Sequence, residues 1–126
     1  NYKQGQDLIY LLQDAFPQHG LIIFGHNNER QEYVGETKYK DNAGVSLFYS
    51  REDFLILSKY CKFFISIDSA LQHICSNQKF NKKGIVLWGS TIPKMFGYDT
   101  NVNLISKYPG CTEIEPKLIV DEALKL

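Results

Sequence analysis

The sequence lacks the features that mark membrane-spanning and nucleic-acid-binding proteins. Its longest purely apolar run, Leu8 to Leu12, has five residues, whereas a membrane-spanning helix needs about 20. Fourteen Lys and Arg residues balance fourteen Asp and Glu residues, so no net charge attracts nucleic acid or an anionic membrane. The chain opens without Met and without a basic-then-apolar leader. We therefore expect a fragment or processed product that has no transmembrane segment and no nucleic-acid partner.

Cysteine is also scarce. Cys61, Cys75 and Cys111 are too few and too widely spaced for a disulfide framework, and no Cys-x-x-Cys pair suggests a structural zinc site. The three histidines are not at metal-ligand spacings. We therefore expect buried, reduced thiols and no bound metal, as in a cytoplasmic protein.

The best-known phosphate-binding and nucleophile motifs are missing as well. The chain contains no Gly-x-x-x-x-Gly-Lys loop, no Gly-x-Gly-x-x-Gly fingerprint and no Gly-x-Ser-x-Gly elbow. Its composition is ordinary, with 44% hydrophobic and 22% charged residues in 126 residues. These values suit one compact domain, or one half of a two-domain enzyme.

What the sequence does contain is a regular alternation of helical and extended patterns. Apolar spacing and capping signals predict helices over 6–16, 27–38 and 50–60, from 69 onwards, and from Pro116 to the C-terminus. Short apolar or alternating runs predict strands over 21–24, 45–49, 63–67, 85–88 and 102–105. Strands that alternate with helices predict an α/β fold, a Rossmann-like three-layer α/β/α domain with a mostly parallel sheet.

In such a sheet, ligands bind where the strands end and the loops begin. In the loop at 67–73, Asp68 and Ser69 start a helix whose first amides have no internal partner, and the small side chains of Ser69 and Ala70 leave room for an anion. His73 follows one turn later on the same face and could donate to a phosphate. The alternative is that Asp68 or Ser69 is only an N-cap, and His73 a half-buried histidine with an ordinary partner.

Two more loops reach the same edge. Gly25 permits a tight turn after the first strand, and Glu29 could accept hydrogen bonds from ribose hydroxyls. The alternative for Glu29 is an exposed residue in the first turn of a helix. The Gly-Ser-Thr turn at 89–91 offers amides and the hydroxyls of Ser90 and Thr91 to a phosphate, although ordinary loops share this composition.

Taken together, the three loops resemble the C-terminal domain of the heptosyltransferase-like glycosyltransferases (glycosyltransferase family 9), whose B-type architecture has two Rossmann-like domains. Residues 64–74 match that family's strand followed by Asp, Ser or Thr, Gly, two residues and His. Residues 85–91 match its apolar strand that ends in Gly, a small residue and Thr, and residues 22–29 match its strand–Gly–acid segment. The resemblance covers roughly residues 5–105.

The resemblance implies that residues 1–126 form a single donor-binding domain, the C-terminal half of a larger two-domain protein. Such enzymes invert the sugar that they transfer from a nucleotide sugar such as ADP-heptose, with no metal or other cofactor. The implied acceptor is a glycan or a lipid-linked, lipopolysaccharide-type molecule bound by an N-terminal domain, which also carries the catalytic base. The enzyme would be cytoplasmic, with peripheral association at the inner face of the membrane.

The site residues follow from the same matches. They are Asp68, Ser69, Ala70, His73, Ser90 and Thr91 for the diphosphate and sugar, and Gly25 and Glu29 for the nucleotide and its ribose.

The sequence also departs from the family pattern. The family has Gly where Ala70 stands, and a Lys before the first helix for which Lys3 is the only local candidate. The family's first strand is not found. These departures leave open a non-catalytic nucleotide- or glycan-binding module on the same scaffold. A flavodoxin-like receiver domain is a weaker alternative, because it needs an acidic cluster after its first strand and only Glu29 is near.

Overall fold

The computed structural model describes residues 4–24, 45–48, 51–108, 111 and 113–126. Its helices are α1 (Gly5–Ala15), α3 (Arg51–Tyr60), α4 (Ala70–Cys75), α5 (Pro93–Phe96) and α6 (Pro116–Leu124). Its strands are β1 (Leu21–Phe24), β2 (Val45–Phe48), β3 (Phe64–Ile67), β4 (Gly84–Trp88) and β5 (Val102–Ile105). The predicted helix over 27–38, and the first residue of the helix predicted over 50–60, Ser50, lie outside the described residues.

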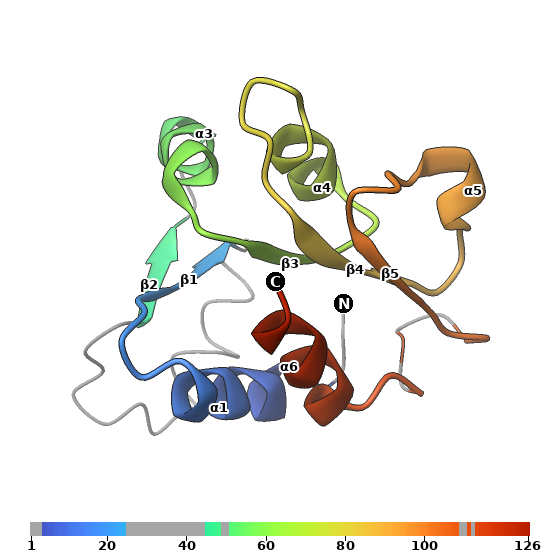
Figure 1. Ribbon diagram of the computed structural model, residues 1–126, viewed down its shortest axis with the longest axis horizontal. Helices are drawn as coiled ribbons and strands as arrows, with labels where there is room; N and C mark the ends of the chain where they lie inside the picture. The colour runs from blue at the N-terminus through green and yellow to red at the C-terminus, as the bar shows by residue number, and fades with distance from the viewer. Residues whose placement is uncertain (1–3, 25–44, 49–50, 109–110, 112) are drawn as a thin grey trace.

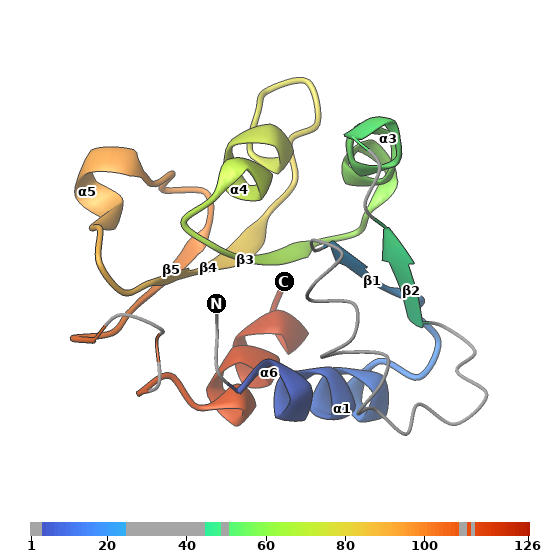
Figure 2. The ribbon, with the colours of Figure 1, turned by 180° about the vertical axis from the view of Figure 1, so that it is seen from behind.

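The strands form two parallel sheets between two layers of helices. β1 pairs with β2, and β3, β4 and β5 form a three-stranded sheet in that order. Helices α1 and α6 cover one side of the strands, and α3, α4 and α5 lie on the other (Figures 1 and 2). This three-layer arrangement with parallel strands confirms the Rossmann-like α/β fold, although its strands are divided between two sheets.

Strand β4 is the centre of the larger sheet, and its five residues are buried. Because side chains alternate along a strand, Ile85 and Leu87 join a core cluster with α1 and α6, whereas Val86 and Trp88 join a second cluster beneath α4. Burial on both faces explains why this strand is apolar throughout.

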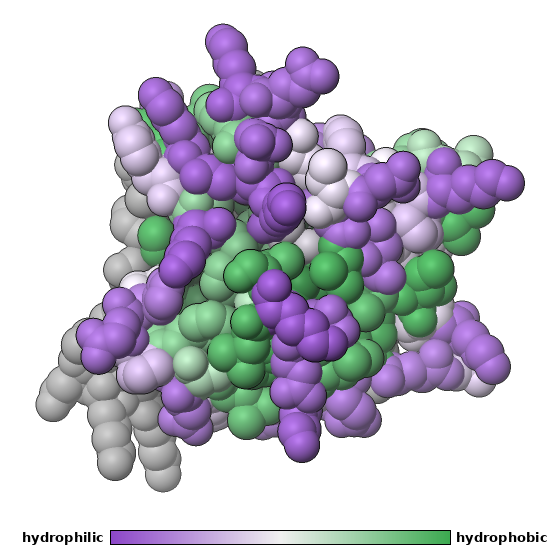
Figure 3. Space-filling model, viewed as in Figure 1, coloured by the Kyte–Doolittle hydropathy of each residue, from purple (hydrophilic) through white to green (hydrophobic). Residues whose placement is uncertain are grey.

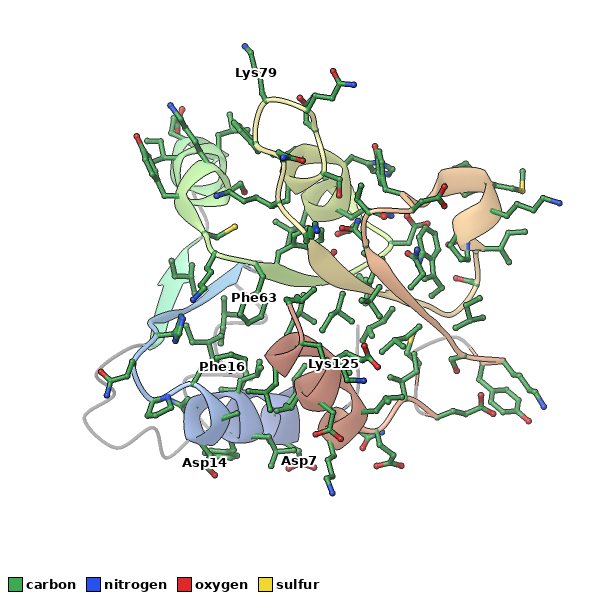
Figure 4. The ribbon with its side chains drawn as sticks, in the orientation of Figure 1. Asp7, Asp14, Phe16, Phe63, Lys79 and Lys125 are labelled. Carbon is green, nitrogen blue, oxygen red and sulfur yellow. The ribbon has the colours of Figure 1, made fainter. Side chains whose placement is uncertain are left out.

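The helix layer formed by α1 and α6 is amphipathic. Leu8 and Leu12 of α1 enter the core with Ile119 of α6, while Asp7 and Asp14 point away from the sheet (Figure 4). At the end of α1, the rings of Phe16 and Phe63 lie with their centroids 5.3 Å apart. Hydrophobic side chains also gather on the surface over α6 (Figure 3).

Candidate functional site

The ends of β3 and β4 bring two of the predicted loops together. Ile67 ends β3 opposite Leu87 of β4, so the segments that follow these parallel strands emerge at the same edge. There the Thr91 hydroxyl donates a hydrogen bond of 2.6 Å to Oδ2 of Asp68. The contact joins side chains 23 residues apart, and it confirms the expectation that the two loops meet.

The other oxygen of the Asp68 carboxylate is held from α4. Nε2 of Gln72 donates a hydrogen bond of 2.5 Å to Oδ1 of Asp68, and Gln72 itself is completely buried. Each carboxylate oxygen therefore accepts one side-chain hydrogen bond, which fixes the plane of the group. Gln72 is not among the predicted site residues, although a Gln that follows an Asp by four residues is a known pairing at helical spacing.

Ser69 takes the N-cap position of α4 but does not act as a side-chain cap. Its backbone is extended, with φ −154° and ψ 177°, and its hydroxyl makes no capping hydrogen bond to α4. Instead, its Oγ lies 2.9 Å from Oγ of Ser66 in the preceding strand. The capping alternative is therefore wrong for the Ser69 side chain. Ala70 follows as the first helical residue, and its side chain is exposed.

His73 is exposed and has a partner outside α4. Its Nδ1 lies 2.9 Å from the Tyr98 hydroxyl, and the two rings meet edge to face with centroids 5.6 Å apart. This agrees with the alternative in which His73 has an ordinary hydrogen-bond partner, except that the side chain is exposed rather than half-buried. Ser90 is exposed on the loop after β4.

A partly buried polar network fixes the segment that carries Tyr98. The indole N–H of Trp88, a fully buried residue, donates 2.9 Å to Oδ1 of Asn103. The Asn103 amide in turn donates to the carbonyl oxygens of Tyr98 and Asn101, at 3.2 and 3.3 Å. Strands β4 and β5 therefore hold Tyr98 in the place where it meets His73.

An open cleft of about 710 Å³ lies beside this contact, between the end of α4 and the α5–β5 connection. Most of the residues that line it have polar side chains, and they include one Lys and one Asp. The residues that line it are His73, Ser76, Asn77, Gln78, Asn81, Pro93, Lys94, Gly97, Tyr98, Asp99 and Thr100. Of the predicted site residues that the structure describes, it includes only His73, and no single sequence motif marks it.

Two predicted residues, Gly25 and Glu29, lie outside the described residues, so their placement stays a prediction. Among the residues that the structure does describe, no group of three or more His, Cys, Asp or Glu side chains is arranged to hold a metal ion. Within the same part of the chain, no helix has both the length and the apolar character needed to cross a membrane.

The three cysteines are free thiols. Cys75 and Cys111 are buried and Cys61 is half-buried, largely as expected. A hydrogen bond with Cys75, with some help from the charge of Lys82, lowers the pKa of Cys61 to about 7. The same contact, together with burial, raises the pKa of Cys75, and burial raises that of Cys111.

Comparison with known proteins gives a likeness of fold. No family model matches the sequence. No curated protein matches it either. Among solved structures, the chain is similar to the E. coli heptosyltransferase WaaC with ADP, with a TM-score of 0.64 and 20% sequence identity. The match covers 99% of this chain and 37% of that chain, so this sequence spans little more than a third of that protein. The likeness shows that this chain shares its fold with part of that protein.

Proposed function

We propose that this chain is the nucleotide-sugar-binding domain of an inverting, heptosyltransferase-like enzyme of glycosyltransferase family 9. One observation carries the proposal. Asp68 and Thr91, which the family resemblance assigns to the donor site, are hydrogen-bonded at the carboxyl edge of β3 and β4, where ligands bind in Rossmann-like sheets. The likeness of fold to a heptosyltransferase whose structure contains ADP supports it.

In this proposal Asp68 recognises the sugar and the start of α4 receives the diphosphate. An ionised carboxylate only accepts hydrogen bonds, so within a nucleotide sugar it suits the hydroxyl groups of the sugar and not the diphosphate. The backbone at Ser69 and Ala70 offers amide donors to the diphosphate, since the Ser69 side chain does not cap them. Thr91 and Ser90 border the sugar, and His73 supports the helix from its contact with Tyr98.

Gly25 and Glu29 keep their proposed role at the nucleotide and ribose. We also propose that residues 1–126 correspond to the C-terminal domain of the complete enzyme, and that the acceptor, a glycan or lipid-linked molecule, binds to an N-terminal domain together with the catalytic base.

The proposed chemical role of this domain is to hold the departing diphosphate. Charge develops on that group as the bond to the anomeric carbon breaks, and donors that are already in place stabilise it without reorganisation. Each such donor is worth roughly 2.7–4 kcal/mol in comparable oxyanion sites. Because the general base belongs to the other domain, we expect the isolated chain to bind nucleotide weakly and to transfer no sugar.

Titration of the chain with ADP, UDP, GDP and CDP sugars, followed by amide chemical shifts, tests the proposal. We expect shifts at residues 68–73 and 89–91. Asp68→Asn should weaken sugar-nucleotide binding about 10–100-fold, because a hydrogen bond to a charged group contributes roughly 1.5–3 kcal/mol. Asp14→Asn is the matched control, since Asp14 is exposed and points away from the sheet (Figure 4).

A second candidate is a non-catalytic nucleotide- or glycan-binding module. Ala70 favours it, because a methyl group where the family has Gly narrows the approach to the backbone. The polar cleft between α4 and α5 also favours it, since amide and hydroxyl side chains suit a glycan. Shifts confined to the cleft residues on addition of an oligosaccharide, with no response to any nucleotide at millimolar concentration, would replace the transferase proposal.

A further inference from the structure

The side chain of Gln72 is buried in a way that packing alone does not explain. Its exposed fraction is 0%, and its carbonyl oxygen Oε1 is buried without a hydrogen-bond partner among the residues that the structure describes. A Met or Leu side chain would fill a similar volume without the penalty of an unpaired carbonyl. The compensating contact is the hydrogen bond from Nε2 of Gln72 to Oδ1 of Asp68.

Asp68 is held from two sides. Gln72 approaches Oδ1 from within α4, and Thr91 approaches Oδ2 from the loop after β4. Because these donors belong to different elements, the carboxylate is fixed in both position and rotation. Each carboxylate oxygen can accept a second hydrogen bond, so the fixed group still offers one acceptor on each oxygen.

We propose that Gln72 is a positioning residue that orients Asp68 to accept two hydroxyl groups of the donor sugar. The inference rests on the proposed function, and it makes the role of Asp68 more specific. Since Asp68 is itself an anion, a diphosphate is repelled from it. Asp68 therefore selects the polyhydroxylated sugar, and Gln72 affects the sugar part of the ligand while leaving the nucleotide part unaffected.

The binding test compares ADP with ADP-heptose by calorimetry. Gln72→Met fills the buried site without an amide donor. It should weaken ADP-heptose binding about tenfold and change ADP binding less than twofold. In the Asp68→Asn background, Gln72→Met should have little further effect on ADP-heptose binding, because both substitutions act on the same Gln72–Asp68 contact. Gln72→Asn, whose amide is too short to reach Asp68, should behave like Gln72→Met. Gln13→Met, on α1 across the sheet, is the matched control.

A second measurement needs no ligand. The ¹³C signal of the Asp68 side-chain carboxyl should move in Gln72→Met and stay in place in Gln13→Met. A signal that stays in place in both variants would overturn the positioning role. Equal losses for ADP and ADP-heptose would also overturn it, since they indicate a general structural defect. If the signal moves but the wild-type chain binds none of the ADP, UDP, GDP and CDP sugars, the proposed function fails and the proposed sugar recognition fails with it, while the contact itself is established.

Discussion

The two faces of the β3–β4–β5 sheet carry different kinds of side chain. The face under α1 and α6 presents only aliphatic side chains: Ile65, Ile67, Ile85, Leu87, Val102 and Leu104. By strand alternation, the face under α4 includes Phe64, Ser66, Gly84, Val86, Trp88 and Asn103. The aliphatic face needs only to exclude water. The mixed face must also provide hydrogen-bond partners for its buried polar groups. Strands β3 and β4 lead into the loops that carry Asp68 and Thr91.

This difference indicates that one face mainly stabilises the fold and the other mainly sets the geometry of polar groups. Apolar side chains buried against α1 and α6 stabilise the fold. Truncating one of them should be strongly destabilising, because a cavity in a close-packed core is costly. The opposite face contains hydrogen-bonded groups such as Trp88 with Asn103 and Gln72 with Asp68. These interactions contribute little net stability but determine geometry. Two substitutions and one chemical probe test the contrast, in decreasing order of expected effect.

The largest effect is expected on the aliphatic face. Ile119 of α6 is completely buried, so Ile119→Ala should lower the free energy of unfolding by about 2–5 kcal/mol, through lost burial and a residual cavity. Urea denaturation measures the change. Leu118→Ala is the control, because this neighbouring side chain is 45% exposed. Its truncation should lower the free energy of unfolding far less. Equal losses for the two variants would contradict the assigned core.

An intermediate effect is expected at Gly84 on the mixed face. A Cβ atom at Gly84 would lie 2.5 Å from the Phe64 ring, so Gly84→Ala should overpack the strand pair and destabilise the fold by about 1–3 kcal/mol. Phe64→Leu in the same chain should relieve part of this loss. A double-mutant cycle in urea measures the coupling, and simple additivity of the two changes would rule out the proposed clash.

The smallest change to the fold is expected from a chemical probe of the thiols. With its pKa lowered to about 7 by the hydrogen bond with Cys75, Cys61 should react with iodoacetamide at half its maximal rate near pH 7. The buried Cys111 of the other core cluster should stay unreactive at that pH, because burial raises its pKa. Mass spectrometry locates the adducts. In Cys75→Ala, the Cys61 profile should move to higher pH.

Much of the fold follows from local pattern. The predicted strands at Leu21–Phe24 and Val102–Ile105 have the observed bounds, because short runs rich in apolar residues mark strands well. They are not buried on both faces, since Ile22 is 37% exposed and Ile105 is 64% exposed. Strand β4 begins one residue earlier than predicted, at Gly84. A glycine carries no apolar signal, yet here it pairs opposite Phe64 and leaves room for that ring.

The parts that sequence reasoning missed depend on tertiary contacts. Helix α5 has four residues, and Met95 and Phe96 are exposed in it. It therefore has no buried apolar face that would predict a helix. Gln72 has a polar side chain, so the sequence alone gives no sign that the folded chain buries it completely. Asp68 and Thr91 were expected at one edge, but only the folded chain shows that they share a hydrogen bond.

The shortness of α4 has a practical consequence. Its six residues rise about 9 Å, with the Asp68 end at one extremity and Cys75 at the other. Cys61 packs against the cluster that contains Cys75. A fluorophore attached to Cys61 would therefore sit about one short helix from the proposed donor pocket, and its emission would give an assay of nucleotide-sugar loading that needs neither an acceptor nor turnover.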